Sequence, residues 1–283
     1  DKGGDVTLVD IRPEWPEGQP GNKGNMWGRV QGDEIVINGQ CSAWVSNGAV
    51  AQVALGYLSA EYEDGFYGPD GNPYGMAVII PLDLPGVSKG KPLDKMGQRA
   101  LPQGEIYFDN VRVPKRFAIA LKDDYYGNMT SAWSFAGTHM GQAFTGVARA
   151  AFELALQYCH ERKQGGRTLI DHQLTRFRLG DMLRRVELCR SVARRSLAYA
   201  RLSPLTHPYV TASAKVTVTQ EAMKVVDEAL QLFGGAGTSR EYPIEKLYRD
   251  ARLALIEDGE NTILTMRLGV LAQQLYAEGW SRN

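Results

Sequence analysis

Three carboxylates surround a glycine near the end of this sequence, in the segment IEDGEN at residues 256–261. A carboxylate in a loop beside glycine could act as a general base, a role that contributes about 10²–10⁴-fold to the rate of a proton transfer. The same acids could instead cap the helix that follows, because negative charge is favourable at a helix start. The residue types alone leave both interpretations of Glu257, Asp258 and Glu260 open.

A tryptophan and a small hydroxyl lie close together in a second segment, AWVSNG at residues 43–48. Trp44 could stack on a flat cofactor while Ser46 donates one hydrogen bond to it. A buried tryptophan beside a turn-forming serine would give the same pattern. The segment therefore indicates either a cofactor contact or an ordinary turn.

Two further segments have the composition of anion-binding loops. ERKQGGR at residues 161–167 places three cations and two glycines together, which could bind a phosphate group or form a solvated helix end. QLFGGAG at residues 231–237 would let a ligand or another backbone approach closely, but such a glycine run also ends helices. Because no strand is predicted directly before it, this run is not a dinucleotide-binding fingerprint.

The overall composition narrows the possible classes of protein. Lys plus Arg and Asp plus Glu both number 32, so the net charge is zero, which argues against a dedicated nucleic-acid binder. No run of about 18 apolar residues occurs, and we therefore expect no membrane span. The three cysteines lack a CxxC pair and the four histidines lack metal-ligand spacing. Neither a disulfide framework nor a metal site is expected, and a cytoplasmic location fits.

The elements that would position these segments change character near residue 120. Short apolar runs bounded by turns predict strands at Glu34–Gly39, Met76–Ile80 and Glu105–Pro114. Residues 1–120 are therefore predicted to form a mainly β domain, built as a small barrel or sandwich.

From about residue 128 the apolar residues recur with the period of a helix. Segments at Gly165-Gly166, Pro204–Pro208 and 234–237 separate four such stripes, so residues 121–283 are predicted to form an antiparallel four-helix bundle. Strands followed by helices indicate the α+β class. The stripes are Val147, Ala151, Leu154 and Tyr158; Met182, Val186, Cys189 and Ala193; Val218, Ala222, Val225 and Ala229; and Ile263, Met266, Val270 and Ala272.

Taken in order, six blocks of this sequence resemble the acyl-CoA dehydrogenase family. The resemblance covers essentially the whole chain, and QLFGGAG followed by YPIEKLYRDA is its most specific part. It implies a β middle domain and a C-terminal four-helix bundle, while the N-terminal helical domain of the family has no counterpart in these residues. The blocks are INGQCSAWVSNG (37–48), KMGQRALPQGEIYFDNVRVP (95–114), HERKQGG (160–166), QLFGGAG (231–237), EYPIEKLYRDARL (241–253) and IEDGEN (256–261).

The resemblance implies an FAD-dependent enzyme that removes two hydrogens from an acyl-CoA thioester. In the family a carboxylate takes the α-proton, the β-hydrogen leaves as hydride to the flavin, and a separate electron-transferring flavoprotein takes the electrons. The cofactor site is shared between subunits, which implies a homotetramer. The residues that match cofactor contacts are Trp44 and Ser46 at the flavin ring, and Arg162, Gln164, Gln231, Gly234 and Gly235 at the FAD of a neighbouring subunit.

Asp258 matches the position at which most members of the family carry a glutamate base. Some members that act on alicyclic acyl-CoAs are known for an aspartate base, so a cyclic substrate such as cyclohexane- or cyclohexene-carboxyl-CoA is expected. The base position used by a few other members corresponds to Ala136-Gly137, which has no carboxylate. The alternatives are a short- or branched-chain acyl-CoA dehydrogenase, a non-catalytic subunit of a mixed complex, and a related flavoenzyme that hydroxylates or decarboxylates.

Overall fold

The computed structural model describes residues 25–69, 71–202, 208–277 and 279. These residues form two compact units: a sheet unit within Asp1–Lys95 and Arg99–Thr130, and a helical unit made of Met96–Gln98 and Ser131–Asn283. The match of residues 1–5 to the family and most of the break predicted at Pro204–Pro208 lie outside the described residues. Each unit is described by itself below.

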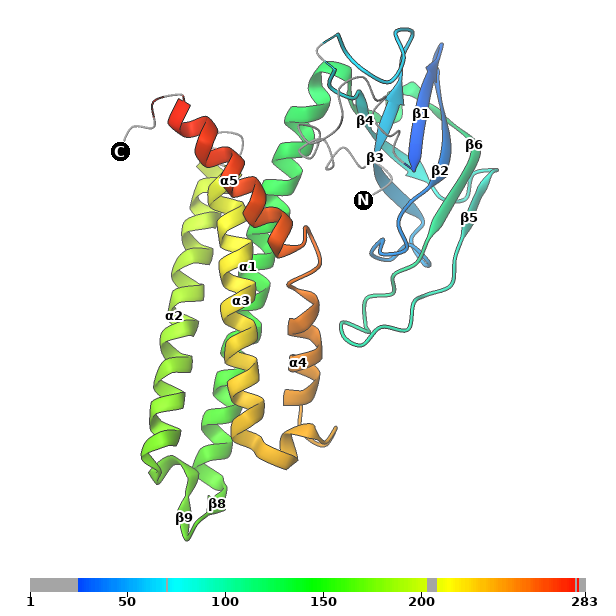
Figure 1. The fold of residues 1–283 in the computed structure, drawn as a ribbon. Helices are drawn as coiled ribbons and strands as arrows, with labels where there is room; N and C mark the ends of the chain where they lie inside the picture. The colour runs from blue at the N-terminus through cyan, green and yellow to red at the C-terminus, as the bar shows by residue number, and fades with distance from the viewer. Residues whose placement is uncertain (1–24, 70, 203–207, 278, 280–283) are drawn as a thin grey trace. The chain divides into compact units, whose positions relative to one another are not determined.

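Seven strands of the sheet unit form one mixed sheet in the order β5-β6-β2-β1-β3-β4-β7, with β5 and β7 at its ends. Figure 1 shows β5 at one end of this sheet, beside β6. The pair β1 and β3 is parallel, and the other neighbouring strands are antiparallel. The predicted barrel or sandwich is not confirmed by this arrangement. The strands are β1 (Met26–Gln31), β2 (Glu34–Gln40), β3 (Val53–Glu61), β4 (Gly75–Pro81), β5 (Val87–Lys89), β6 (Ile106–Pro114) and β7 (Ala118–Leu121).

The strands predicted from sequence are confirmed by β2, β4 and β6. In β6, Ile106 and Phe108 are buried, and so are Val111 and Val113. Two consecutive exposed residues at 109–110 interrupt the alternation between these two pairs. β2 has an irregular register beside Gly39, whose φ is +101°. A Cβ added at Gly39 would lie 1.9 Å from the carbonyl oxygen of Asn25, so the close approach of the two backbones requires glycine.

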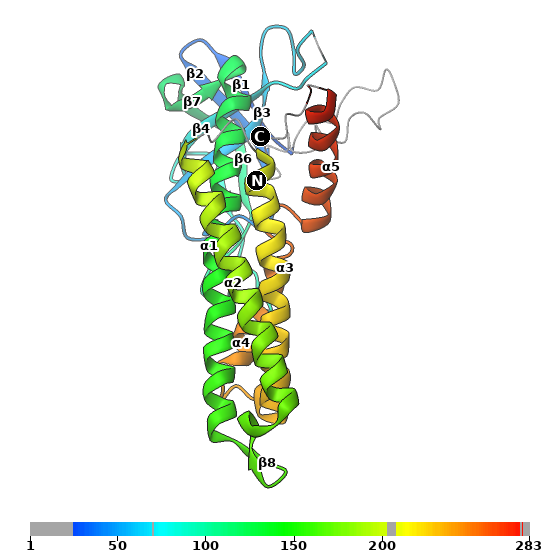
Figure 2. The same ribbon diagram turned by 90° about the vertical axis from the view of Figure 1, so that its left-hand side faces the viewer.

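Five α-helices make up the rest of the described fold. They are α1 (Lys122–Glu161), α2 (Gln173–Leu202), α3 (Pro208–Phe233), α4 (Ile244–Leu253) and α5 (Asn261–Ala277). In the helical unit α1, α2 and α3 lie side by side along most of their length (Figure 2). A short hairpin of β8 (Lys163–Gln164) and β9 (Arg167–Thr168) joins α1 to α2, and a 3-10 helix, Gly234–Thr238, follows α3.

The bundle core confirms three of the four predicted stripes and corrects the fourth. The stripes on α1, α2 and α3 pack in one cluster, in which Met182, Val186 and Ala222 are at most 2% exposed. The fourth contributor to this cluster is α4, through Ile244 and Ala251, and no residue of α5 belongs to it. Periodicity on α5 correctly identified an apolar helix face, but burial of that face also requires a neighbouring element.

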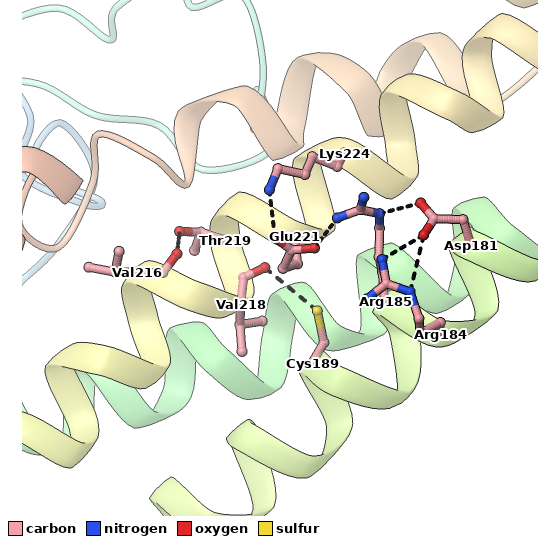
Figure 3. A network of polar contacts seen from close by, with 9 residues as sticks. All are labelled: Asp181, Arg184, Arg185, Cys189, Val216, Val218, Thr219, Glu221 and Lys224. Atoms are coloured by element: carbon pink, nitrogen blue, oxygen red, sulfur yellow. Dashed lines mark hydrogen bonds and ion pairs between the residues drawn. The ribbon is translucent and has the colours of Figure 1, made fainter. Parts of the chain in front are cut away.

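An ion-pair network joins α2 to α3 (Figure 3). Arg185 donates hydrogen bonds to Asp181 on its own helix and to Glu221 on α3, and Lys224 donates to the other oxygen of Glu221. The side chains of Arg185 and Glu221 are only 22% and 13% exposed. Burial alone would raise the pKa of Glu221, but the hydrogen bonds from Lys224 and Arg185 outweigh that effect and lower it.

Candidate active site

The segment that contains Asp258 is a sharp turn between α4 and α5. Its backbone leaves α4 through hydrogen bonds from the amides of Ile256 and Glu257 to the carbonyl oxygen of Leu253. Asp258 and Gly259 then adopt φ values of +49° and +92°, a left-handed region that non-glycine residues rarely occupy. The side chain of Asp258 is exposed, so the turn presents this carboxylate outward from the bundle.

The three acids of the turn have different partners. Glu260 caps α5, because its carboxylate accepts hydrogen bonds from the amides of Thr262 at 2.8 Å and Ile263 at 3.1 Å. Glu257 accepts a 2.6 Å hydrogen bond from the side-chain amide of Gln98. Among the described residues, no hydrogen bond to the carboxylate of Asp258 is found. The capping alternative therefore applies to Glu260, while Asp258 remains available to a substrate.

The carboxylate of Glu260 accepts hydrogen bonds from the backbone amides of Thr262 and Ile263, and these bonds lower its pKa. The bond from Thr262 has the larger effect. This carboxylate therefore stays ionised in its capping role. Its side chain is committed to the start of α5 and contributes no hydrogen bond to a ligand in this conformation.

Two polar residues that sequence reasoning missed lie against this turn. Gln98 has a φ of +47°, and its backbone amide donates a hydrogen bond to Asp250 at the end of α4. Lys215 is completely buried on α3, and its ammonium group donates to the carbonyl oxygen of Gly259 at 2.6 Å. The signal for Lys215 was its position three residues before Val218, the first residue of the predicted stripe on α3, because a cation is unusual on an apolar helix face.

The alternative base position on α1, about Ala136-Gly137, carries no carboxylate. A Cβ added at Gly137 would lie 3.2 Å from the carbonyl oxygen of Thr211 on α3. A side chain at Gly137 would therefore be tightly packed against α3. Among the two base positions considered from sequence, Asp258 alone carries a carboxylate.

The five residues matched to a neighbouring subunit's FAD gather at one end of the bundle. The ring of Tyr158 near the end of α1 stacks on that of Phe233 at the end of α3, with ring centres 4.1 Å apart. Arg162 and Gln164 follow Tyr158, whereas Gln231 lies two residues before Phe233 and Gly234 and Gly235 come directly after it. All five matched residues are exposed. Nothing lies within 4 Å of a Cβ added at either of these two glycines, so their backbone is open to a ligand.

This end of the bundle is separate from the turn that carries Asp258. Helix α4 starts shortly after the glycine segment and runs ten residues to the turn. A helix of that length spans about 15 Å. In one chain, the residues matched to FAD at the bundle end and the turn of Asp258 therefore form two distinct surfaces.

Trp44 and Ser46 belong to the sheet unit. The side chain of Trp44 is 59% exposed, so the interpretation of Trp44 as a buried core residue is wrong. Its carbonyl oxygen accepts a hydrogen bond from Gln103, and Ser46 forms a β-bridge with the same residue. The residue that follows, Asn47, has a φ of +60° and turns the chain back, which leaves Trp44 and Ser46 on an anchored, exposed turn.

Comparisons with known proteins place this chain in a family. The sequence pattern described as acyl-CoA dehydrogenase, C-terminal domain, matches residues 132–272. A probable acyl-CoA dehydrogenase, YngJ, of Bacillus subtilis (strain 168) is 34% identical over 249 residues, which cover 86% of this chain and 62% of that protein. A cyclohex-1-ene-1-carbonyl-CoA dehydrogenase of Syntrophus aciditrophicus (strain SB) is 30% identical, and the match covers 84% of this chain and 56% of that protein.

The fold agrees with the sequence comparisons. The butyryl-CoA dehydrogenase of Megasphaera elsdenii superposes with a TM-score of 0.81 at 26% identity, over 92% of this chain and 66% of that one. The chain belongs to the acyl-CoA dehydrogenase family. It spans about 60% of the length of the curated relatives it matches.

Within the part of the chain that the structure describes, none of the helices combines the length and the apolar character that a membrane span requires.

Members of this family are FAD-dependent flavoproteins, and the residues present fit that cofactor. Trp44 offers an exposed aromatic face, which suits a flat ring system. At the bundle end, the exposed cation Arg162 and the open backbone at Gly234 and Gly235 suit a pyrophosphate group.

Proposed function

We propose that this chain carries the catalytic machinery of an FAD-dependent acyl-CoA dehydrogenase in which Asp258 is the general base. The observation that supports this role is the left-handed turn at Asp258 and Gly259, which holds an exposed carboxylate while its two acidic neighbours are hydrogen-bonded elsewhere. The outward orientation leaves both carboxylate oxygens accessible to a substrate.

The reaction divides between this carboxylate and the cofactor. Asp258 takes the acidic proton next to the thioester carbonyl, and the electron pair left on the α-carbon forms the new carbon–carbon double bond as the β-hydrogen departs with its electrons. When bound, FAD supplies the acceptor for that hydride. Base and acceptor must face opposite sides of the substrate, so correct positioning of Asp258 contributes much of the rate.

The cofactor is proposed to be held by two groups of residues from different subunits of a homotetramer. Trp44 and Ser46 would contact the flavin ring from the sheet unit. Arg162 and Gln164, together with the segment Gln231–Gly235, would contact the FAD of a neighbouring subunit. The separation between the bundle end and the turn of Asp258 supports this assignment, because one chain presents them as two distinct surfaces. A separate electron-transferring flavoprotein is the proposed electron acceptor.

A cyclic acyl group is the proposed substrate class. Aspartate is one methylene shorter than glutamate, so the carbon that loses its proton must approach the turn more closely. In cyclohexane-carboxyl-CoA this carbon is a member of the ring, so the shape of the ring determines how closely it approaches the turn. The relative of 30% identity that is named for cyclohex-1-ene-1-carbonyl-CoA supports this class, and the structural neighbour named for butyryl-CoA supports the short-chain alternative.

The base assignment is tested with Asp258→Asn in the full-length, FAD-loaded protein. The variant is expected to reduce its bound flavin with an acyl-CoA at least 10²-fold more slowly, because general-base catalysis contributes about 10²–10⁴-fold. Its flavin absorbance should be unchanged. Glu153→Gln, the same carboxylate-to-amide change on the exposed face of α1, serves as the control. Loss of activity in Glu257→Gln but not in Asp258→Asn would assign the base to the neighbouring acid.

The substrate class is tested with a panel of thioesters and an artificial electron acceptor. Cyclohexane-carboxyl-CoA should give a higher kcat/KM than butyryl-CoA or isobutyryl-CoA. Cyclohex-1-ene-1-carboxyl-CoA has no α-hydrogen, so its turnover would require removal of a vinylogous proton instead. A straight-chain thioester that is used equally well or better would refute the alicyclic preference. Wild-type protein that takes up no FAD would favour a non-catalytic subunit.

A further inference from the structure

Lys215 is the most deeply buried cation among the described residues, with no exposed surface. It lies in α3 one turn before Thr219, which is also completely buried. A charged amine at this depth loses its hydration and requires polar partners in return. Those partners identify what the residue does.

The ammonium group of Lys215 donates hydrogen bonds to two residues that follow Asp258. It donates a 2.6 Å hydrogen bond to the carbonyl oxygen of Gly259, the residue directly after Asp258. A second bond of 2.8 Å goes to the side-chain oxygen of Asn261, the first residue of α5. The side-chain amide of Asn261 in turn donates to the hydroxyl of Thr219 at 3.0 Å. One buried network therefore ties the turn to α3.

This network contacts the part of the turn whose backbone has a rarely occupied conformation. Asp258 and Gly259 are consecutive left-handed residues, and aspartate adopts that conformation only when its surroundings impose it. The bond from Lys215 fixes the orientation of the peptide group that follows Gly259. Without it, the turn could relax and the carboxylate of Asp258 would move.

The charge of Lys215 also faces the acids of the turn. Burial lowers the pKa of Lys215 from 10.5 to about 8, and the nearby carboxylates of Asp258, Glu257 and Glu260 act in the opposite direction. On the α1 side the chain presents Gly137, where an added Cβ would be 3.8 Å from the Cβ of Lys215 and where no charge is present. The acids of this turn therefore favour the ionised form of Lys215.

We propose that Lys215 is the positioning residue for the base, because its two hydrogen bonds fix the turn that presents the carboxylate of Asp258. This inference rests on the proposed function of Asp258. It adds a residue on a different helix, which would never touch the substrate. The third polar contact of the turn, from Gln98 to Glu257, restrains it from the opposite flank.

The test uses Lys215→Met in the full-length, FAD-loaded protein, because methionine has a similar length and no charge. The rate of α-proton exchange of cyclohexane-carboxyl-CoA and of butyryl-CoA into deuterated water is measured by mass spectrometry as a function of pH. A displacement of about 1 Å can cost about 10²-fold in rate, so the exchange rate should fall about 10–100-fold while KM changes less than threefold. Any alkaline limb near pH 8 in the wild type should disappear.

Two further variants separate the contributions. Lys224→Met, on the same helix and in an exposed ion pair, is the matched control and should leave the rate and the pH profile unchanged. Asn261→Ala keeps the charge of Lys215 but removes one acceptor, so the rate should fall while any alkaline limb near pH 8 is retained. This variant also tests the proposal if Lys215→Met does not fold.

The outcomes distinguish the two levels of the argument. An active wild type together with a Lys215→Met variant of wild-type rate and pH profile would overturn the role of Lys215 alone. An Asn261→Ala variant of wild-type rate would do the same for the hydrogen-bond network. A wild type that binds FAD but exchanges no α-proton on either thioester would overturn the proposed function itself.

Discussion

The ion pair between Arg185 and Glu221 should contribute far more to stability than the pair between Lys224 and the same glutamate. Both cations donate to Glu221, so the acid is a common partner and burial is the main difference between the pairs (Figure 3). The side chain of Arg185 is 22% exposed and that of Lys224 is 55% exposed. Replacing each cation by methionine compares the two positions directly.

The expected magnitudes follow from this difference in exposure. Breaking a fully buried pair by removing one partner costs about 3–5 kcal/mol, whereas exposed pairs contribute about 0.2–1 kcal/mol. Arg185→Met leaves both Glu221 and Asp181 without a partly buried partner, so we expect a loss of about 2 kcal/mol. Lys224→Met should cost less than about 0.5 kcal/mol. The double variant Arg185→Met/Glu221→Leu should recover part of the loss, because it removes the partly buried carboxylate that Arg185→Met leaves with only the exposed Lys224 as a partner.

The measurement is urea unfolding of the full-length protein, followed by far-ultraviolet circular dichroism, with unchanged m values as the check on comparability. Hydrogen bonds hold the pKa of Glu221 below its usual 4.5 despite burial, so its stabilisation is complete above pH 4.5 and is lost as the pH falls through the lowered value. The deficit of Arg185→Met should therefore be large at pH 7 and shrink in acid. Equal costs for Arg185→Met and Lys224→Met would refute the argument from burial.

Two other substitutions probe the cap and the core. Glu260→Gln removes the charge that caps α5 and should cost about 1 kcal/mol at pH 7. Because the pKa of Glu260 is lowered in the folded state, the difference from wild type should shrink below pH 4.5 and vanish as the pH falls through the lowered pKa. Thermal unfolding at pH 7 and pH 3 measures this difference. Met182→Ala, at a completely buried position of α2, should lower the free energy of unfolding in urea by about 3 kcal/mol. The control Leu197→Ala, at a 41% exposed position, should lower it by less than about 1 kcal/mol. Similar losses in the two variants would contradict the assigned core.

Most of the helical unit could be predicted from periodicity, because long amphipathic helices repeat one signal several times. The stripes that include Met182 and Val218 pack as expected. Helix α4 was harder to find because its ten residues give less than three turns of pattern and include several charges. The stripe on α5 was assigned to the core wrongly, since sequence periodicity identifies the apolar face of a helix but not the element that covers it.

The candidate site was predictable where a residue type has a distinctive chemistry beside glycine. Asp258 stood out on that basis, whereas Lys215 did not, because a single lysine in a long helix is normally solvated. Its role depends on a contact to Gly259, 44 positions later in the chain. The contact of Gln98 could not be predicted from the sequence either, since its partner Glu257 is 159 positions away. Such contacts depend on tertiary structure and leave no local pattern.

The length of helix α4 determines the separation of two surfaces within each chain. The helix begins just beyond the glycine segment and ends just before the turn of Asp258, so its ten residues set how far apart those two surfaces lie and how they are rotated about the helix axis. Adding or deleting one residue would shift the turn by about 1.5 Å along the axis and rotate it by about 100°. Substitutions on the exposed side of α4 can therefore be tolerated during evolution, while changes in its length would uncouple the two surfaces.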